Sequence, residues 1–220
     1  MPTFVLLYAL RSWIAPLPLE ESHATVERVL RDDAAAGFEA YAKRDWQGCT
    51  AAFEDVLAAG EPADARLASN LHATLGACYD ELERPSEALR HHRRALALDP
   101  ANAGAWANLG VSRRLAGRYE LAEEAYERAL RLDPDNAVVH ANLGAVQVLR
   151  GQPGRAIERL RRAIQLDRRL AAAHANLAVA YARLGRLVEA EAALGAAVEL
   201  GYAGAAGVKA ILAGERARRR

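Results

Sequence analysis

The sequence predicts an all-α solenoid of about five helix-turn-helix repeats, and three observations support this fold class. The same residue types recur at intervals of 34 residues along most of the chain. Between them, apolar residues step by three and four, as they do on one face of a helix. Glycines and Asp-Pro pairs recur where the helices of each repeat are expected to end.

Columns of equivalent residues define the repeat. They are a leucine column (Leu75, Leu109, Leu143, Leu177), a glycine column (Gly76, Gly110, Gly144, with Ala178) and two alanine columns (Ala88, Ala122, Ala156, Ala190 and Ala95, Ala129, Ala163, Ala197), closed by Leu98, Leu132, Leu166 and Leu200. Four repeats in register cannot arise by chance, so the repeat is the organising unit of the fold.

Each column has a physical reason. Residues 103–116 read as the first helix of a repeat and residues 119–132 as the second. Gly117, with its equivalents one and two repeats on, follows the first helix, where a left-handed cap favours a residue without a Cβ. Gly110 and Gly144 lie inside helices, where glycine costs about 1 kcal/mol relative to alanine. We therefore expect them to mark close helix contacts.

The repeats divide the chain into three parts. Residues 1–29 form an apolar N-terminal segment with a lead-in helix, and residues 203–220 form a capping helix with a basic tail. The solenoid occupies residues 30–202, in repeats of about 30–68, 69–102, 103–136, 137–170 and 171–202. The first of these is degraded and carries a five-residue insertion around Gly60. Because a solenoid needs a polar end cap, we expect the basic tail to be a solubilising cap and not a nucleic-acid arm.

The spacing and the column residues resemble the tetratricopeptide repeat. The third repeat carries most of that pattern: Trp106, Leu109, Gly110, Gly117, Tyr119, Ala122, Tyr126, Ala129 and Pro134. The resemblance runs from Leu30 to about Tyr202 and implies a right-handed superhelix whose concave face, lined by first helices, receives a peptide or partner segment. The chain departs from the pattern in its tryptophan column (His72, Trp106, His140, His174) and in its tyrosine column, at Arg113 and Gln147.

One polar column on the first helices is the candidate binding site. Its members are Thr74, Asn108, Asn142 and Asn176, and we expect Val111, Val148 and Val179 to supply apolar contacts beside it. An asparagine amide offers two donors and an acceptor, enough to pair with a peptide backbone. The column resembles the asparagine ladder in the repeat domain of O-linked N-acetylglucosamine transferases. The alternative is that asparagine merely belongs to the helix consensus at this position.

Other site classes find little support. The lysines of a carboxylate clamp are replaced by Ala73, Ala107 and Ala141. His140 and His174 are one repeat step apart, too far to share a zinc ion, and His91-His92 has no acidic or thiol partner nearby in sequence, so we expect no metal site. No motif of a catalytic site or phosphate loop is present, so we expect neither an enzyme nor a cofactor.

Charge and cysteine content bound the partners and the compartment. The formal net charge is +1, which gives nucleic acid little attraction. Cys49 and Cys78 are too few for a disulfide framework, so we expect both to be packing residues in a reducing compartment. The apolar run Phe4 to Leu10 is too short to span a bilayer and lacks the flanks of a signal peptide, so we expect a cytoplasmic protein without stable membrane insertion. That run is expected to cover the first repeat, with a weak interfacial anchor as the alternative.

The sequence therefore predicts a bacterial protein-interaction scaffold that binds an extended peptide or partner segment in a concave groove. The alternatives are a regulatory or targeting subunit of a separately encoded enzyme, such as a glycosyltransferase, and, with less support, an RNA-binding helical repeat.

Overall fold

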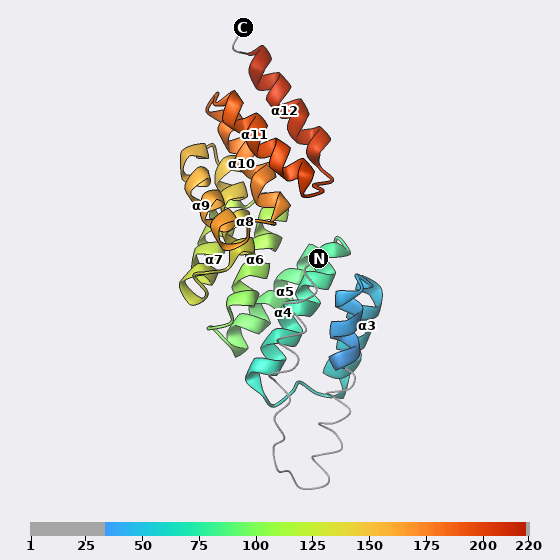
Figure 1. The fold of residues 1–220 in the computed structure, drawn as a ribbon. Coiled ribbons are helices and arrows are strands. Elements are labelled where there is room, and N and C mark those ends of the chain that lie inside the picture. Colours follow the sequence, from blue (N-terminus) through green and yellow to red (C-terminus); the bar gives the residue numbers. More distant parts are fainter. Residues whose placement is uncertain (1–33, 219–220) are drawn as a thin grey trace. The chain divides into compact units, whose positions relative to one another are not determined.

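The computed structural model describes residues 34–218, and all the regular structure in that range is helical. Residues 34–42 are helical. The helices that follow are α3 (Trp46–Ala59), α4 (Ala65–Glu81), α5 (Pro85–Leu98), α6 (Ala103–Leu115), α7 (Tyr119–Leu132), α8 (Ala137–Leu149), α9 (Pro153–Leu166), α10 (Ala171–Arg183), α11 (Leu187–Glu199) and α12 (Ala205–Ala217) (Figure 1). The predicted fold class, an all-α helical solenoid, is confirmed, and the helix bounds in the third repeat agree with the prediction to within a residue.

The chain divides into two compact units, with the boundary in the sequence between Ala105 and Trp106. In the N-terminal unit, α3 packs on α4 and α4 on α5 around a core that includes Phe53, Leu75 and Tyr79. In the C-terminal unit, α8 packs on α9, α9 on α10 and α10 on α11, so each helix pair buries its apolar faces against the next pair.

The glycine column lies where helices approach most closely, as predicted. A Cβ on Gly110 would lie 2.6 Å from Cε1 of Tyr126, and one on Gly144 would lie 2.6 Å from Cγ of Leu160. In the N-terminal unit a Cβ on Gly76 would lie 2.5 Å from Cε1 of His92. In each case a side chain of the second helix occupies the space that a larger residue on the first helix would need.

The turns after the first helices require left-handed backbone. Gly117, Gly151 and Gly185 have φ values of 70°, 71° and 76°, which confirms the predicted caps. In the N-terminal unit the equivalent turn position is held by Glu83, with φ 57°. A side chain with a Cβ is strained in this conformation, so this turn is held against a local preference.

The departure at Gln147 from the tyrosine column has a polar compensation. Gln147 is fully buried and its Nε2 donates to Oε1 of Glu123 over 3.0 Å. Glu123 is itself buried and also binds Arg150 and, over 3.2 Å, Arg155. The alternating charges of α7 and α9 therefore pair between repeats, as expected, but this carboxylate lies inside the molecule and not on a solvated outer face.

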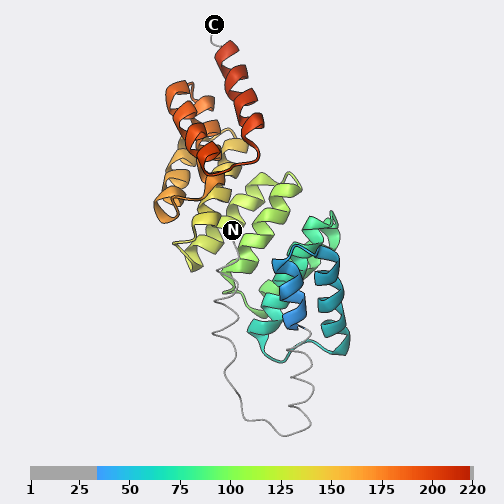
Figure 2. The ribbon, with the colours of Figure 1, turned by 45° about the vertical axis from the view of Figure 1, so that its right-hand side comes forward.

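The last helix closes the C-terminal end of the solenoid. Val208 and Leu212 of α12 join the core formed by α10 and α11, and both views show α12 beside α11 (Figure 2). Glu215 accepts from Arg183 of α10 over 3.1 Å, and Arg216 pairs with Glu191 of α11. The ion pairs of Glu215 and Arg216 thus fix the cap to the last repeat.

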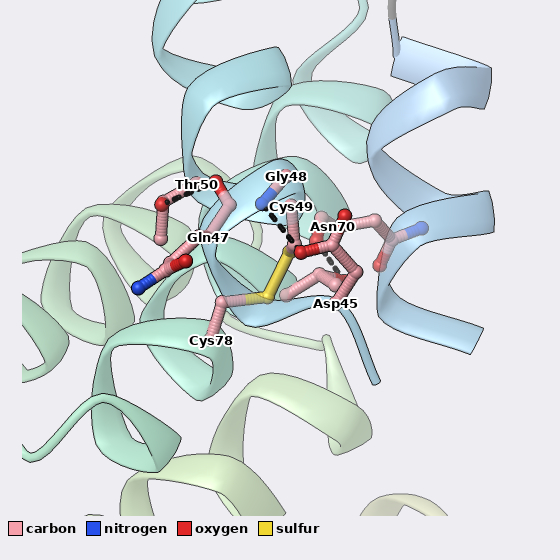
Figure 3. The surroundings of a disulfide bond; sticks show 8 residues. Asp45, Gln47, Gly48, Cys49, Thr50, Asn70 and Cys78 are labelled. Carbon is pink, nitrogen blue, oxygen red and sulfur yellow. Dashed lines mark hydrogen bonds between the residues drawn. A yellow bond between two sulfur atoms is a disulfide. The ribbon is translucent and has the colours of Figure 1, made fainter. Parts of the chain in front are cut away.

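The two cysteines correct the sequence interpretation. Both are fully buried, as expected, but they are not separate packing residues: a disulfide joins Cys49 in α3 to Cys78 in α4, with their Cα atoms 6.5 Å apart (Figure 3). Sequence spacing could not show that the two helices bring these positions together. Disulfides persist mainly in oxidising compartments, which argues against the expected reducing one.

Several expectations fall on residues that the structure does not describe. The apolar N-terminal segment, with its proposed covering or anchoring role, and the final Arg219 and Arg220 lie outside residues 34–218. Within that range, no helix combines the length and apolar character needed to cross a membrane.

Candidate peptide-binding face

The candidate binding residues lie on the first helix of successive repeats. Thr74 is on α4 in the N-terminal unit, and Asn108, Asn142 and Asn176 are on α6, α8 and α10 in the C-terminal unit. All four side chains are half-buried. Part of each of these side chains is therefore accessible at the surface.

Hydrogen bonding separates the members of the column. The Thr74 hydroxyl donates to the carbonyl of Asn70, 2.9 Å away in its own helix. Asn142 and Asn176 form no side-chain hydrogen bond with any described residue, and α8 packs directly on α10. Two neighbouring helices therefore present amide groups at equivalent positions, each able to donate and to accept.

The apolar residues beside the column differ in exposure. Val111, Val148 and Val179 are half-buried and pack against the core clusters of the C-terminal unit. Leu115 and Leu149, at the ends of α6 and α8, are 58% and 55% exposed. Periodicity did not single these leucines out, because it shows the side of a helix and not how deeply a residue is buried.

The N-terminal unit contains a polar cluster that the sequence interpretation missed. His91 and His92 are buried, and Nε2 of His92 is 3.2 Å from Oδ2 of Asp80, an acidic partner that is distant in sequence. The Nδ1 atoms of His72 and His91 are 2.8 Å apart, and Nε2 of His72 is 2.9 Å from Oε1 of Glu61. The partners are 11 to 19 residues apart in sequence, so only folding reveals them.

The electrostatics of this cluster follow from burial and from one arginine. When His72 donates from Nε2 to the Glu61 carboxylate, its Nδ1 accepts from His91. Burial lowers the pKa of His91 to about 4, with a further contribution from His72. The hydrogen bond from Arg94 lowers the pKa of Glu61 to about 2. His72 and His91 are thus neutral imidazoles at neutral pH, and His72 is hydrogen-bonded to an ionised carboxylate.

The histidines of the tryptophan column in the C-terminal unit have structural roles. His140 donates from Nε2 to the Pro134 carbonyl over 3.0 Å, and His174 donates to the Arg168 carbonyl over 3.1 Å. Each imidazole therefore ties its helix to the preceding turn. Across residues 34–218, no cluster of three or more histidine, cysteine or acidic residues could hold a metal ion.

Comparison with solved structures supports the fold. The protein MamA matches with a TM-score of 0.62 and 23% identity, over 81% of this chain and 95% of that chain. PilF of Pseudomonas aeruginosa matches with a TM-score of 0.69 and 22% identity, over 80% of this chain and 78% of its own. YrrB, described as a tetratricopeptide-repeat protein with an unusual peptide-binding site, matches with a TM-score of 0.56 and 25% identity, over 69% and 77% of the two chains.

Family models identify the repeat directly. Among curated proteins, no sequence matches the chain. Three models, each described as a tetratricopeptide repeat, match residues 71–104, 102–169 and 147–213. These matches join into one stretch from residue 71 to residue 213, well over half of the sequence. The chain therefore belongs to the tetratricopeptide-repeat family.

Proposed function

We propose that this protein is a binding scaffold, without catalytic activity of its own, that holds an extended segment of a partner protein along the first helices of its C-terminal unit. Asn142 and Asn176 would hydrogen-bond the backbone of that segment, with Asn108 extending the column within the same unit. Val111, Val148, Val179 and the exposed Leu115 and Leu149 would contact its side chains.

One observation carries the proposal: Asn142 and Asn176 are half-buried, are equivalent in two packed helices and have no side-chain partner among the described residues. A half-buried amide with unused donors and acceptors contributes little to folding, because alanine is the better helix former. The same amide gains a hydrogen bond when an extended backbone lies across it.

Two likenesses support the same function. Tetratricopeptide-repeat proteins commonly bind protein segments on their first helices, and YrrB, at 25% identity, is described as having a peptide-binding site. The asparagine column also resembles the ladder in the repeat domain of O-linked N-acetylglucosamine transferases. A partner that is itself an enzyme would make this chain its targeting subunit, the alternative within the same binding role.

The test compares the wild type with Asn142→Ala/Asn176→Ala. The partner is captured on the immobilised full chain and identified, and its binding segment is titrated by calorimetry. Losing two hydrogen bonds of about 0.5–1.5 kcal/mol each should weaken binding by about 1–3 kcal/mol, or roughly 5- to 150-fold. Gln47→Ala, which removes an exposed amide from α3, serves as the control and should leave affinity unchanged.

The outcomes separate the possibilities. Undiminished affinity in a folded double variant would place the binding surface elsewhere. Failure of the double variant to fold would show that the asparagines are structural. If the captured partner is RNA, its affinity should fall steeply with salt, and the scaffold proposal would be wrong.

A further inference from the structure

The C-terminal unit has an accessible hollow lined by its last three repeat helices, α9, α10 and α11. It has a volume of about 470 Å³ and lies where α9 and α11 both pack on α10. Its apolar surface comes from Ile164, Leu177, Tyr181, Ala192, Ala193 and Ala196. We call it the α9–α11 pocket. Because His174, Leu177 and Tyr181 lie on one side of α10 and Asn176 on another, this pocket is separate from the asparagine column.

An earlier repeat shows side chains that can fill an equivalent place. Two repeats earlier, the tryptophan column holds Trp106, and the guanidinium of Arg128 lies 5.9 Å from the centre of its ring. In the last repeat the equivalents of these residues are His174 and Ala196. A large ring and a long side chain are thus both replaced by smaller groups, and the space that they would fill is open.

A second position beside the pocket has also lost a long side chain in the last repeat. Glu124 and Glu158 occupy one equivalent position on α7 and α9, and α11 has Ala192 there. Both glutamates and Ala192 are exposed. At this position α11 therefore lacks the long polar side chain that α7 and α9 carry. An incoming side chain can reach the apolar residues of the pocket past the small Ala192.

The pocket lining carries one arginine, Arg161, and one glutamate, Glu189. Arg161 donates to the Tyr181 hydroxyl over 2.8 Å and forms no ion pair with a described carboxylate. Arg168 and Arg169, in the turn that His174 binds, are exposed and also form no ion pair within the described range. The acidic residue of the lining, Glu189, is already paired with Arg186 over 2.6 Å. A carboxylate beside the pocket would find an available arginine, whereas a cation would not find an available acid.

We propose that the α9–α11 pocket is an anchor site for an aromatic side chain, of indole or phenyl size, in a partner segment that carries a carboxylate next to it. The ring takes the place that Trp106 and Arg128 fill in the earlier repeat, and it buries against Ile164 and Leu177. Aromatic anchors of this kind dominate the energetics of small interfaces. The carboxylate pairs with Arg161, which favours acidic segments over basic ones.

The test uses indole-3-acetate, which carries a ring and a carboxylate in one molecule, and 3-methylindole, which lacks the carboxylate. Both are titrated into the full chain while methyl resonances are followed by NMR. Ile164 and Leu177 should shift with saturation at a Kd of the order of millimolar for indole-3-acetate, as expected for a ligand of this size. The methyls of Leu71 and Leu75 in the N-terminal unit are the internal control and should not move.

Three variants assign the roles. Arg161→Gln should reduce the affinity for indole-3-acetate to that for 3-methylindole. Ala196→Arg should abolish binding of both probes by filling the pocket. If that variant unfolds, Ala192→Glu at an exposed position still tests the proposal, because it restores the long side chain that the earlier repeats carry there. It should weaken the binding of both probes several-fold, and that of indole-3-acetate more strongly because the two carboxylates repel each other.

The remaining outcomes are decisive and independent of the proposed function. Asn142→Ala/Asn176→Ala should bind both probes as the wild type does, even if it no longer binds the partner segment. Shifts that do not saturate, or that persist unchanged in Ala196→Arg or Ala192→Glu, would overturn the anchor site. If sedimentation shows a dimer that Ala196→Arg converts to monomer, the pocket holds a second copy of the chain, and the partner proposal is wrong.

Discussion

Gly144→Ala should destabilise the protein, although alanine is the better helix former. Intrinsic propensity favours alanine over glycine inside a helix by about 0.5–1 kcal/mol. Against this, the new Cβ would lie 2.6 Å from Cγ of Leu160 and 3.3 Å from the backbone oxygen of Ala156. Leu160 is fully buried, so it has little room to move away. Overpacking of this kind costs about 1–3 kcal/mol, so the expected net loss is about 0–2.5 kcal/mol.

Gly195→Ala provides the matched control for this prediction. Gly195 lies inside α11, is exposed, and a Cβ there would meet nothing within 4 Å. Gly195→Ala should therefore raise the free energy of unfolding by the full difference in helix propensity, about 0.5–1 kcal/mol. Subtracting the change in unfolding free energy of one variant from that of the other cancels the helix propensity. What remains is the cost of the helix contact alone, about 1–3 kcal/mol.

The assay is urea unfolding of both variants and the wild type, followed by helical circular dichroism under one set of conditions. The midpoint should move down for Gly144→Ala and up for Gly195→Ala, with similar slopes. Equal increases in the two midpoints would refute the argument, because they would show that the helices can separate freely at Gly144 and that the column carries no packing constraint.

Three further predictions concern stability. The cysteines of the Cys49–Cys78 disulfide are separated by 29 residues, so reducing the bond should lower the unfolding free energy of the N-terminal unit by about 3–4 kcal/mol through loop entropy. A thiol assay on unreduced, denatured protein should find no free cysteine, and two free thiols would contradict the bond. Ala129→Leu, at a position only 1% exposed, should cost about 1–3 kcal/mol, and an unchanged urea midpoint would remove this column from the helix contacts. Burial lowers the pKa of His91 from 6.5 to about 4. Between these pH values the unfolded chain therefore binds more protons than the folded chain. The free energy of unfolding should accordingly fall as the pH is lowered from about 6.5 to 4. His91→Phe should flatten that dependence in urea titrations at several pH values, and an equally steep profile would show that other groups cause it.

The sequence was sufficient for the repeat and for the local rules that shape it. A period of 34 residues, apolar steps of three and four, and glycine after the first helix follow from helix geometry, which acts on neighbours along the chain. Gly110 and Gly144 could also be read as contact points, because glycine inside a helix is unfavourable without such a reason. The position of the asparagine column on the first helices follows from the same periodicity.

Tertiary structure decided whatever depends on partners that are distant in sequence. Cys49 and Cys78 form a bond because α3 and α4 pack together, and His72 contacts His91 because α4 packs on α5. The α9–α11 pocket exists because the positions of His174 and Ala196, modest departures when read singly, face the same space. Periodicity assigns each residue to a side of its helix. It does not determine which side chains of other helices meet it there, because that depends on the packing of helices whose contacts are non-local.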